Sequence, residues 1–196
     1  MKVNVVIVGV GGQGVLTTSH ILARAAMLDG FNVVSAETHG MAQRGGSVEV
    51  HLRIGDVKAP LCPYGSADYL ASLEPVEALR YCQYLNEKTK IILNTRKIPP
   101  PSVSIGLARY PEIEEIVETL REFSESVYLL NASDIAERCG NIQATNVVIA
   151  GALIALGLPV KLETVENVIR EYMHPKFVDL NLRALREGYN ECKKFI

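Results

Sequence analysis

Residues 3–14, VNVVIVGVGGQG, contain the stretch that decides the fold. Residues 5–8 form a short β-branched run, which is typical of a central strand covered on both faces. Gly9, Gly11 and Gly14 then follow the spacing G-x-G-x-x-G. Glycine accepts positive φ and lets a ligand or backbone approach, and a helix starting near Gly14 would point free N–H groups at the turn. The pattern predicts a strand, a turn and a helix. The glycines are explained equally well by an anion-binding site at the turn and by tight packing of the strand against the helix.

Composition indicates an ordinary globular protein. The 196 residues are 48% apolar and 21% charged, and the formal net charge of -2 gives no reason to expect nucleic acid or a membrane surface as partner. The longest apolar run, residues 147–160, is too short to span a bilayer. The first strand begins at once, with no targeting segment before it, so we expect a cytoplasmic protein. One domain over residues 1–196 is expected, with an α/β core at 1–131 and a helical extension at 132–196.

The four cysteines, Cys62, Cys82, Cys139 and Cys192, are far apart and form no C-x-x-C pair. We therefore predict free or buried thiols and no metal held by this chain alone. No Ser/His/Asp or Cys/His signature and no P-loop lysine stands out, so catalytic residues stay unknown.

The second and third strands favour a departure from the dinucleotide-binding pattern. Residues 31–36 form the second strand, and Glu37 closes it where such a fold holds an acid for the ribose. The loop HGMAQRGG is too short for a helical crossover to residues 48–54, whose alternating pattern predicts a half-exposed strand. The third strand is therefore predicted to be antiparallel to the second. The expected fold is an α/β, Rossmann-like mixed sheet, mostly parallel and flanked by helices.

Two glycine-rich loops supply the candidate binding residues. The first holds Gly9, Gly11, Gly12, Gln13 and Gly14, and the second holds Arg44, Gly45 and Gly46. Arginine offers a rigid fork to an anion, and the glycines let a backbone approach, although a turn with a solvated arginine is an equal alternative. The hydroxyls at residues 17–19 can contact an anion or serve in capping. His39 and His51 are expected to be structural.

The remaining chain predicts a strand at residues 69–73, a helix from 74 to about 85, a strand at 90–93, a stiff proline loop at 99–101 and a strand at 127–130. From residue 133 the pattern is helical, and the apolar helix at 143–156 should be buried. A narrow apolar seam on residues 175–194 fits packing on the same domain or a partner interface.

Several motifs together resemble the gamma-type domain of 2-oxoacid:ferredoxin oxidoreductases. They are GVGGQGVLTTSHILARAAMLDG, AETHGMAQRGGSVEVHLRIG, ADYLASLEPVEALR and GNIQATNVVIAGAL, which extend over most of the chain. The segment HGMAQRGG is most similar to the corresponding segment in small (beta) subunits of the indolepyruvate branch of that family.

The resemblance implies an enzyme subunit that is inactive alone. Such enzymes decarboxylate a 2-oxoacid on thiamine diphosphate with Mg, form an acyl-CoA, and pass electrons through [4Fe-4S] clusters to ferredoxin. The thiamine and clusters would lie on a large partner subunit. The two glycine loops, which we expect at the same end of the sheet, would hold an anionic part of coenzyme A or line the partner interface. An NAD-dependent dehydrogenase using the first glycine loop and Glu37, and a cofactor-free scaffold module, remain as alternatives.

Overall fold

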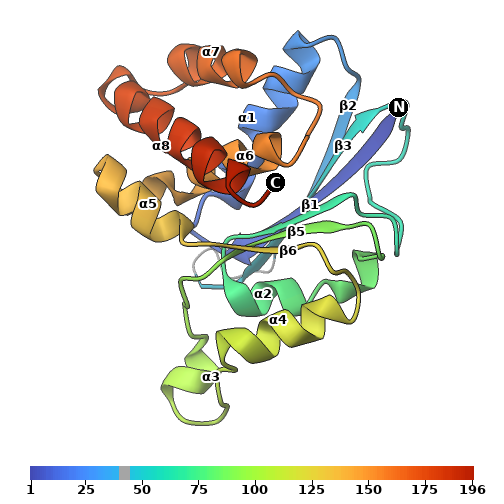
Figure 1. Cartoon of the computed structure of the whole chain (residues 1–196), viewed down its shortest axis with the longest axis vertical. Coiled ribbons are helices and arrows are strands. Elements are labelled where there is room, and N and C mark those ends of the chain that lie inside the picture. Colours follow the sequence, from blue (N-terminus) through green and yellow to red (C-terminus); the bar gives the residue numbers. More distant parts are fainter. Residues whose placement is uncertain (40–44) are drawn as a thin grey trace.

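A computed structural model describes residues 1–39 and 45–196 of the protein. A six-stranded sheet has the order β2-β3-β1-β4-β5-β6 (Figure 1). The strands are β1 Lys2–Val10, β2 Val33–His39, β3 Ser47–Gly55, β4 Tyr69–Ser72, β5 Lys90–Asn94 and β6 Val127–Leu130. The α-helices are α1 Val15–Leu28, α2 Pro75–Leu79, α3 Pro101–Ser104, α4 Ile113–Arg121, α5 Ala132–Cys139, α6 Thr145–Ala155, α7 Leu162–Tyr172 and α8 Pro175–Lys193. Two 3-10 turns are η1 Cys82–Tyr84 and η2 Ile142–Ala144.

The antiparallel third strand is confirmed. β3 runs antiparallel to both β2 and β1, whereas β1, β4, β5 and β6 are mutually parallel. Because β3 pairs with β1 along its whole length, it separates β1 from β2 in the sheet. The chain therefore keeps a first β-α-β unit but leaves β2 at the sheet edge.

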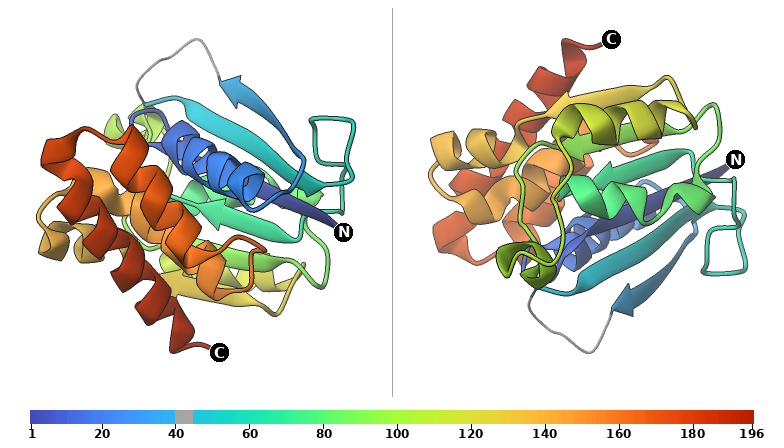
Figure 2. Two further views of the ribbon diagram at one scale, coloured as in Figure 1. Left: turned by 90° about the horizontal axis from the view of Figure 1, so that it is seen from above. Right: turned by 90° about the horizontal axis from the view of Figure 1, so that it is seen from below.

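Helices cover both faces of the sheet. Figures 1 and 2 show α1 and α5–α8 on one face and α2 and α4 on the other. Side chains of β1 alternate between the two layers: Val5 and Ile7 join the core under α1, and Val6 and Val8 join the core under α2 and α4. The predicted burial of the apolar helix is confirmed, because every residue of α6 is buried. In the described part of the chain no helix has the length and apolarity needed to cross a membrane.

The seam on α8 packs on its own chain. Leu182, Leu185 and Cys192 are buried against the helical layer, although Ile196 at the end of the series stays 66% exposed. The crossing of α6 and α8 is very close, and glycines allow it. A Cβ on Gly151 would lie 2.1 Å from the carbonyl oxygen of Leu185.

The prediction of a half-exposed third strand was wrong. The polar face of β3 is covered, and His51 and Arg53 are only 1% and 8% exposed. The covering element is the irregular segment after β3, which bonds to both side chains. The backbone N–H of Cys62 donates to His51 Nδ1 (3.2 Å), and Arg53 donates to the carbonyls of Ala59 (2.6 Å) and Leu61 (3.0 Å). Two of the alternating polar residues of β3, His51 and Arg53, are thus buried with hydrogen-bond partners in this segment.

The predicted helix from residue 74 is shorter than expected. α2 ends at Leu79, and Arg80 and Tyr81 then donate to carbonyls three residues back, which tightens the chain toward η1. This turn places the Tyr81 hydroxyl 2.7 Å from Ser47 Oγ on β3. Pro101, predicted to lie in a loop, instead begins the short helix α3, where its missing N–H has no cost.

Candidate functional site

The glycine turn between β1 and α1 is braced by Gln13. Its Oε1 accepts the Val10 N–H (2.8 Å), and its Nε2 donates to the Leu73 carbonyl after β4 (2.9 Å). Both polar ends of the Gln13 side chain are therefore engaged within the protein. Its backbone N–H also donates within the turn, to the Val10 carbonyl (3.1 Å), so Gln13 shapes the turn rather than facing a ligand.

The glycines of the turn divide into two kinds. A Cβ on Gly9 would lie 2.8 Å from the anchored Gln13 Oε1 and 2.9 Å from Val15 Cγ2, and one on Gly14 would lie 2.8 Å from Asn146 Nδ2. Close packing thus favours glycine at both positions, and the positive φ of Gly14 (+84°) adds a second reason there. Gly12 and Gly45 have positive φ, +102° and +76°, and open space where a Cβ would stand. Close approach of a ligand is therefore possible at Gly12 and Gly45.

The two glycine loops meet at one end of the sheet. The Gly11 N–H donates to the Gly46 carbonyl (2.8 Å), and the Gly45 N–H donates to the Gly11 carbonyl (3.4 Å). This juxtaposition was expected from the sequence. Arg44 lies outside the described residues, so the arginine clamp stays a prediction.

A cavity of about 410 Å³, here called the rim cavity, opens beside these loops. Its lining combines the glycine turn with residues that follow β5 and with the η2–α6 junction: Val10, Gly11, Gly12, Gln13, Gly45, Arg96, Lys97, Ile98, Ser133, Ile142, Gln143 and Thr145. Arg96 and Lys97 were missed by sequence reasoning. Their only signal was their place just after a parallel strand, at the sheet edge where ligands of α/β folds bind.

The two cations at the rim cavity are held by surface ion pairs. Arg96 lies 2.8 Å from Glu137 and 3.5 Å from Asp134, and Lys97 lies 2.7 Å from Glu112. Both cationic side chains are partly exposed, at 42% and 36%. Exposed pairs of this kind contribute about 0–1 kcal/mol. Either side chain can thus turn toward an anion at little cost.

Glu74 fixes the segment that carries these cations. Its side chain is 1% exposed, and it accepts the N–H groups of Ile98 (3.0 Å) and Glu77 (3.1 Å) as well as the Tyr110 hydroxyl. Burial and the neighbouring Glu74 raise the pKa of Tyr110, so that hydroxyl stays protonated and donates. The chain after Lys97 is therefore anchored to α2.

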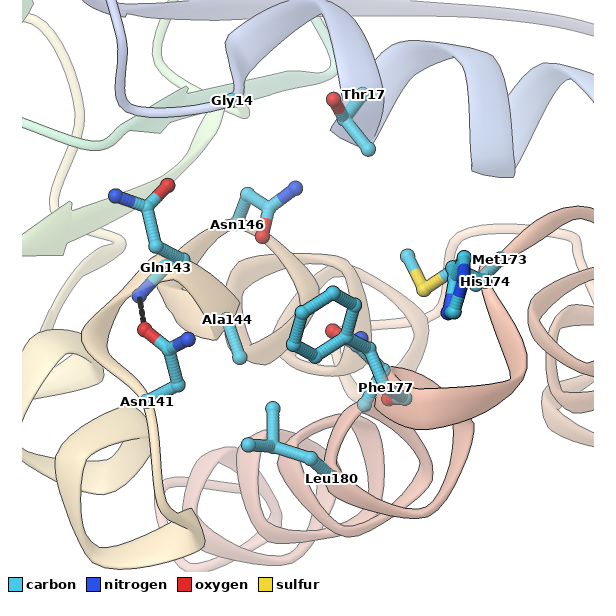
Figure 3. Close-up of a pocket in the computed structure, with 11 residues that line it drawn as sticks. Gly14, Thr17, Asn141, Gln143, Ala144, Asn146, Met173, His174, Phe177 and Leu180 are labelled. Atoms are coloured by element: carbon cyan, nitrogen blue, oxygen red, sulfur yellow. Dashed lines mark hydrogen bonds between the residues drawn. The ribbon is translucent and has the colours of Figure 1, made fainter.

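A second cavity of about 370 Å³, here called the helix cavity, lies between the starts of α1, α6 and α8 (Figure 3). Gly14 and Thr17 face it from α1, Asn146 from α6, and Phe177 from α8. Gln143 lines both this cavity and the rim cavity. The two cavities thus adjoin around the start of α6.

The position of Glu37 does not suit a nicotinamide cofactor. Glu37 lies on β2, one strand beyond β3, and its carboxylate pairs with His20 Nε2 at 2.9 Å. In the dinucleotide fold the acid stands on the strand next to the glycine turn. The insertion of β3 therefore separates the two halves of the NAD pattern.

The polar groups that line the two cavities are suited to binding an anion. No three His, Cys, Asp or Glu side chains among them gather as a metal site. Burial raises the pKa of all four cysteine thiols, to about 11 for Cys62 and Cys192, which keeps them protonated at neutral pH. The two adjoining cavities, with glycine backbone, amides and two cations, fit an anionic ligand.

Comparisons with known proteins agree in fold and family. Residues 4–191 match the family described as pyruvate ferredoxin/flavodoxin oxidoreductase. The chain is 61% identical to indolepyruvate oxidoreductase subunit IorB of Archaeoglobus fulgidus, over 98% of this chain and 96% of that protein. It is 42% identical to the subunit of the same name from Methanothermobacter thermautotrophicus, over 96% and 97%. The crystal structure of pyruvate oxidoreductase subunit PORC from Thermotoga maritima has the same fold, with a TM-score of 0.74, 24% identity and 96% of each chain covered.

Proposed function

The chain belongs to the pyruvate ferredoxin/flavodoxin oxidoreductase family, and from this premise we propose that it is the small subunit of an indolepyruvate-type 2-oxoacid:ferredoxin oxidoreductase. The complex would oxidatively decarboxylate an aryl pyruvate to an acyl-CoA and pass the electrons to ferredoxin. Two relatives that are 61% and 42% identical, both named indolepyruvate oxidoreductase subunits, support this substrate class.

In this complex, two subunits would have different roles in the reaction. We assign thiamine diphosphate with Mg and the [4Fe-4S] clusters to a large partner, as the resemblance to this family implies. Bound there, these groups would supply the decarboxylation and the electron transfer. This chain would bind and orient coenzyme A and contribute a wall of the reaction cleft.

The observation that carries the role of this chain is the meeting of its two glycine loops beside Arg96 and Lys97. Open backbone at Gly12 and Gly45 lets a phosphate approach, and the two cations offset its charge. We assign the diphosphate of coenzyme A to the rim cavity. Gly9, Gln13 and Gly14 support this site through packing, and the part of Arg44 rests on sequence alone.

Co-purification from the native source tests the subunit assignment. We expect the chain to bring down a yellow-brown partner that contains thiamine, and the pair to reduce ferredoxin with an aryl pyruvate and coenzyme A. The chain alone should be inactive. Substrate oxidation by the isolated chain, or tight NADH binding, would instead favour a dehydrogenase.

Replacing both rim cations tests the ligand assignment. In the reconstituted complex, the double variant Arg96→Ala/Lys97→Ala should raise the Kd of coenzyme A by at least about 10-fold, since a single hydrogen bond to a charged group contributes about 1.5–3 kcal/mol. Arg121→Ala, which removes an exposed arginine on α4, is the matched control and should leave the Kd unchanged. Unchanged affinity together with unchanged assembly in the double variant would remove the rim cavity from the proposal.

A further inference from the structure

The helix cavity has the electrostatic character of an anion site. Three helices, α1, α6 and α8, begin at its wall, and none of them has an acidic residue in its first turn. A helix N-terminus carries about half a positive charge, so three positive ends face this space without a local counter-charge. Among the described residues that line the cavity there is no carboxylate, and His174 is the only one with a titratable side chain.

Asn146 is the second and independent observation. Its side chain is 95% buried, and its carboxamide makes no hydrogen bond with any described residue. Figure 3 shows this amide in the space between Thr17 and Phe177. The backbone carbonyl of Asn146, by contrast, accepts the Thr18 hydroxyl (3.2 Å), so the residue is anchored while its amide is left free for a ligand.

The neighbouring groups suit an acceptor-rich ligand. Gly14 leaves room for the Asn146 amide nitrogen, which lies 2.8 Å from the position a Cβ would take. Thr17, an exposed residue in the first turn of α1, lines the same space and carries a hydroxyl. Amide N–H, hydroxyl and helix N-termini are the groups that hold phosphate oxygens in proteins.

The order of the cavities along the sheet edge matches the order of groups in one ligand. The helix cavity adjoins the rim cavity at Gln143, and the rim cavity adjoins at Gly45 an apolar trough of about 400 Å³ that contains Ile98 and the prolines 99–101. A coenzyme A molecule has, in sequence, a 3′-phosphate, a diphosphate and a less polar pantetheine arm. The trough suits the arm, and the rim suits the diphosphate.

We propose that the helix cavity binds the 3′-phosphate of coenzyme A through Asn146 and Thr17. This assignment rests on the proposed function, and it adds a second phosphate subsite to the rim. The ligand is thereby distinguished from dephospho-coenzyme A, which lacks that phosphate. Free inorganic phosphate is the other source of the same chemistry.

Calorimetric titration of the full chain and of the reconstituted complex tests the assignment with coenzyme A and dephospho-coenzyme A. We expect wild type to bind coenzyme A at least about 10-fold more tightly than dephospho-coenzyme A. Asn146→Asp keeps the shape but places a negative charge beside the phosphate, so this preference should fall to about one. Asn190→Asp, which adds the same charge at an exposed position on α8, should keep the preference. Thr17→Val is a second variant that should reduce the preference without adding charge.

The outcomes separate this subsite from the proposed function. Equal affinity for the two ligands in wild type, or an unchanged preference in Asn146→Asp, would overturn the subsite while leaving rim binding in place. If Asn146→Asp weakened subunit assembly but left the preference for coenzyme A unchanged, the cavity would be a protein contact, and the 3′-phosphate subsite would be overturned. If neither ligand bound to wild type, the proposed role of this chain in binding coenzyme A would be wrong. Binding of inorganic phosphate that Asn146→Asp abolishes, together with equal affinity of wild type for the two coenzymes, would assign the cavity to free phosphate and also overturn the 3′-phosphate subsite.

Discussion

Adding one methyl group at Gly151 should destabilise the protein by separating α6 from α8. A Cβ there would lie 2.1 Å from the Leu185 carbonyl oxygen and 2.9 Å from the Tyr189 nitrogen. Close carbon–oxygen contacts between elements normally lie at about 3.3–3.6 Å. The helices would therefore have to part by about 1 Å. Gly188 makes the reciprocal contact, because its Cβ would lie 2.1 Å from the Val148 carbonyl oxygen.

The magnitude follows from two opposing effects. Alanine is better than glycine in a helix by about 1 kcal/mol, which would stabilise the variant. Overpacking a core costs about 1–3 kcal/mol, occasionally more, and here the obstructing atoms are backbone, which cannot rotate away as a side chain can. We expect a net loss of about 2–3 kcal/mol for Gly151→Ala, at the upper end of that range or beyond it. For a chain of this length that corresponds to a fall in Tm of about 4–12 °C.

Thermal unfolding and urea titration would measure the effect. Gly12→Ala is the matched control: it adds the same methyl group in open space, so only its positive φ of +102° opposes it, at about 1–2 kcal/mol. Because α6 carries Asn146 and α8 carries Phe177, Gly151→Ala should also widen the helix cavity and weaken any ligand bound there. A Gly151→Ala protein as stable as wild type would refute the reasoning about the helix crossing.

Three further changes test the buried polar contacts. Glu74→Gln should lower the free energy of unfolding by about 1–3 kcal/mol, since the new amide group would face donors; denaturant titration measures it, and an unchanged midpoint would contradict the anchoring role. Gln13→Leu should cost a similar amount, about 1–3 kcal/mol, by leaving the Val10 N–H and Leu73 carbonyl unpaired, which amide hydrogen exchange at Val10 would reveal; unchanged exchange there would argue against bracing. Burial lowers the pKa of His51 below 6.5, so the folded state binds fewer protons than the unfolded state and stability is lost as pH falls below 6.5. His51→Asn should flatten this part of a plot of Tm against pH, and a retained slope would place its origin in another group.

The sequence by itself determined the local elements and one topological choice. The β-branched run, the glycine spacing and the left-handed Gly14 fix a strand, a turn and a helix within a dozen residues, because these preferences act over short distances. The short loop before β3 excluded a crossover helix, and this loop length alone predicted the antiparallel pair. The meeting of the two glycine loops followed from the same strand directions.

Only the tertiary structure decided what surrounds that turn. The pairing of β3 with β1 moves Glu37 away from the glycine turn, and the segment after β3 buries His51. Neither of these features has a local signal in the sequence. Arg96 and Asn146 reach the two cavities from elements more than 80 residues beyond the glycine turn. Long-range packing sets which strand edges pair and which side chains share a space. Local spacing therefore identified the backbone of the site but not the cation and the amide that give it chemical character.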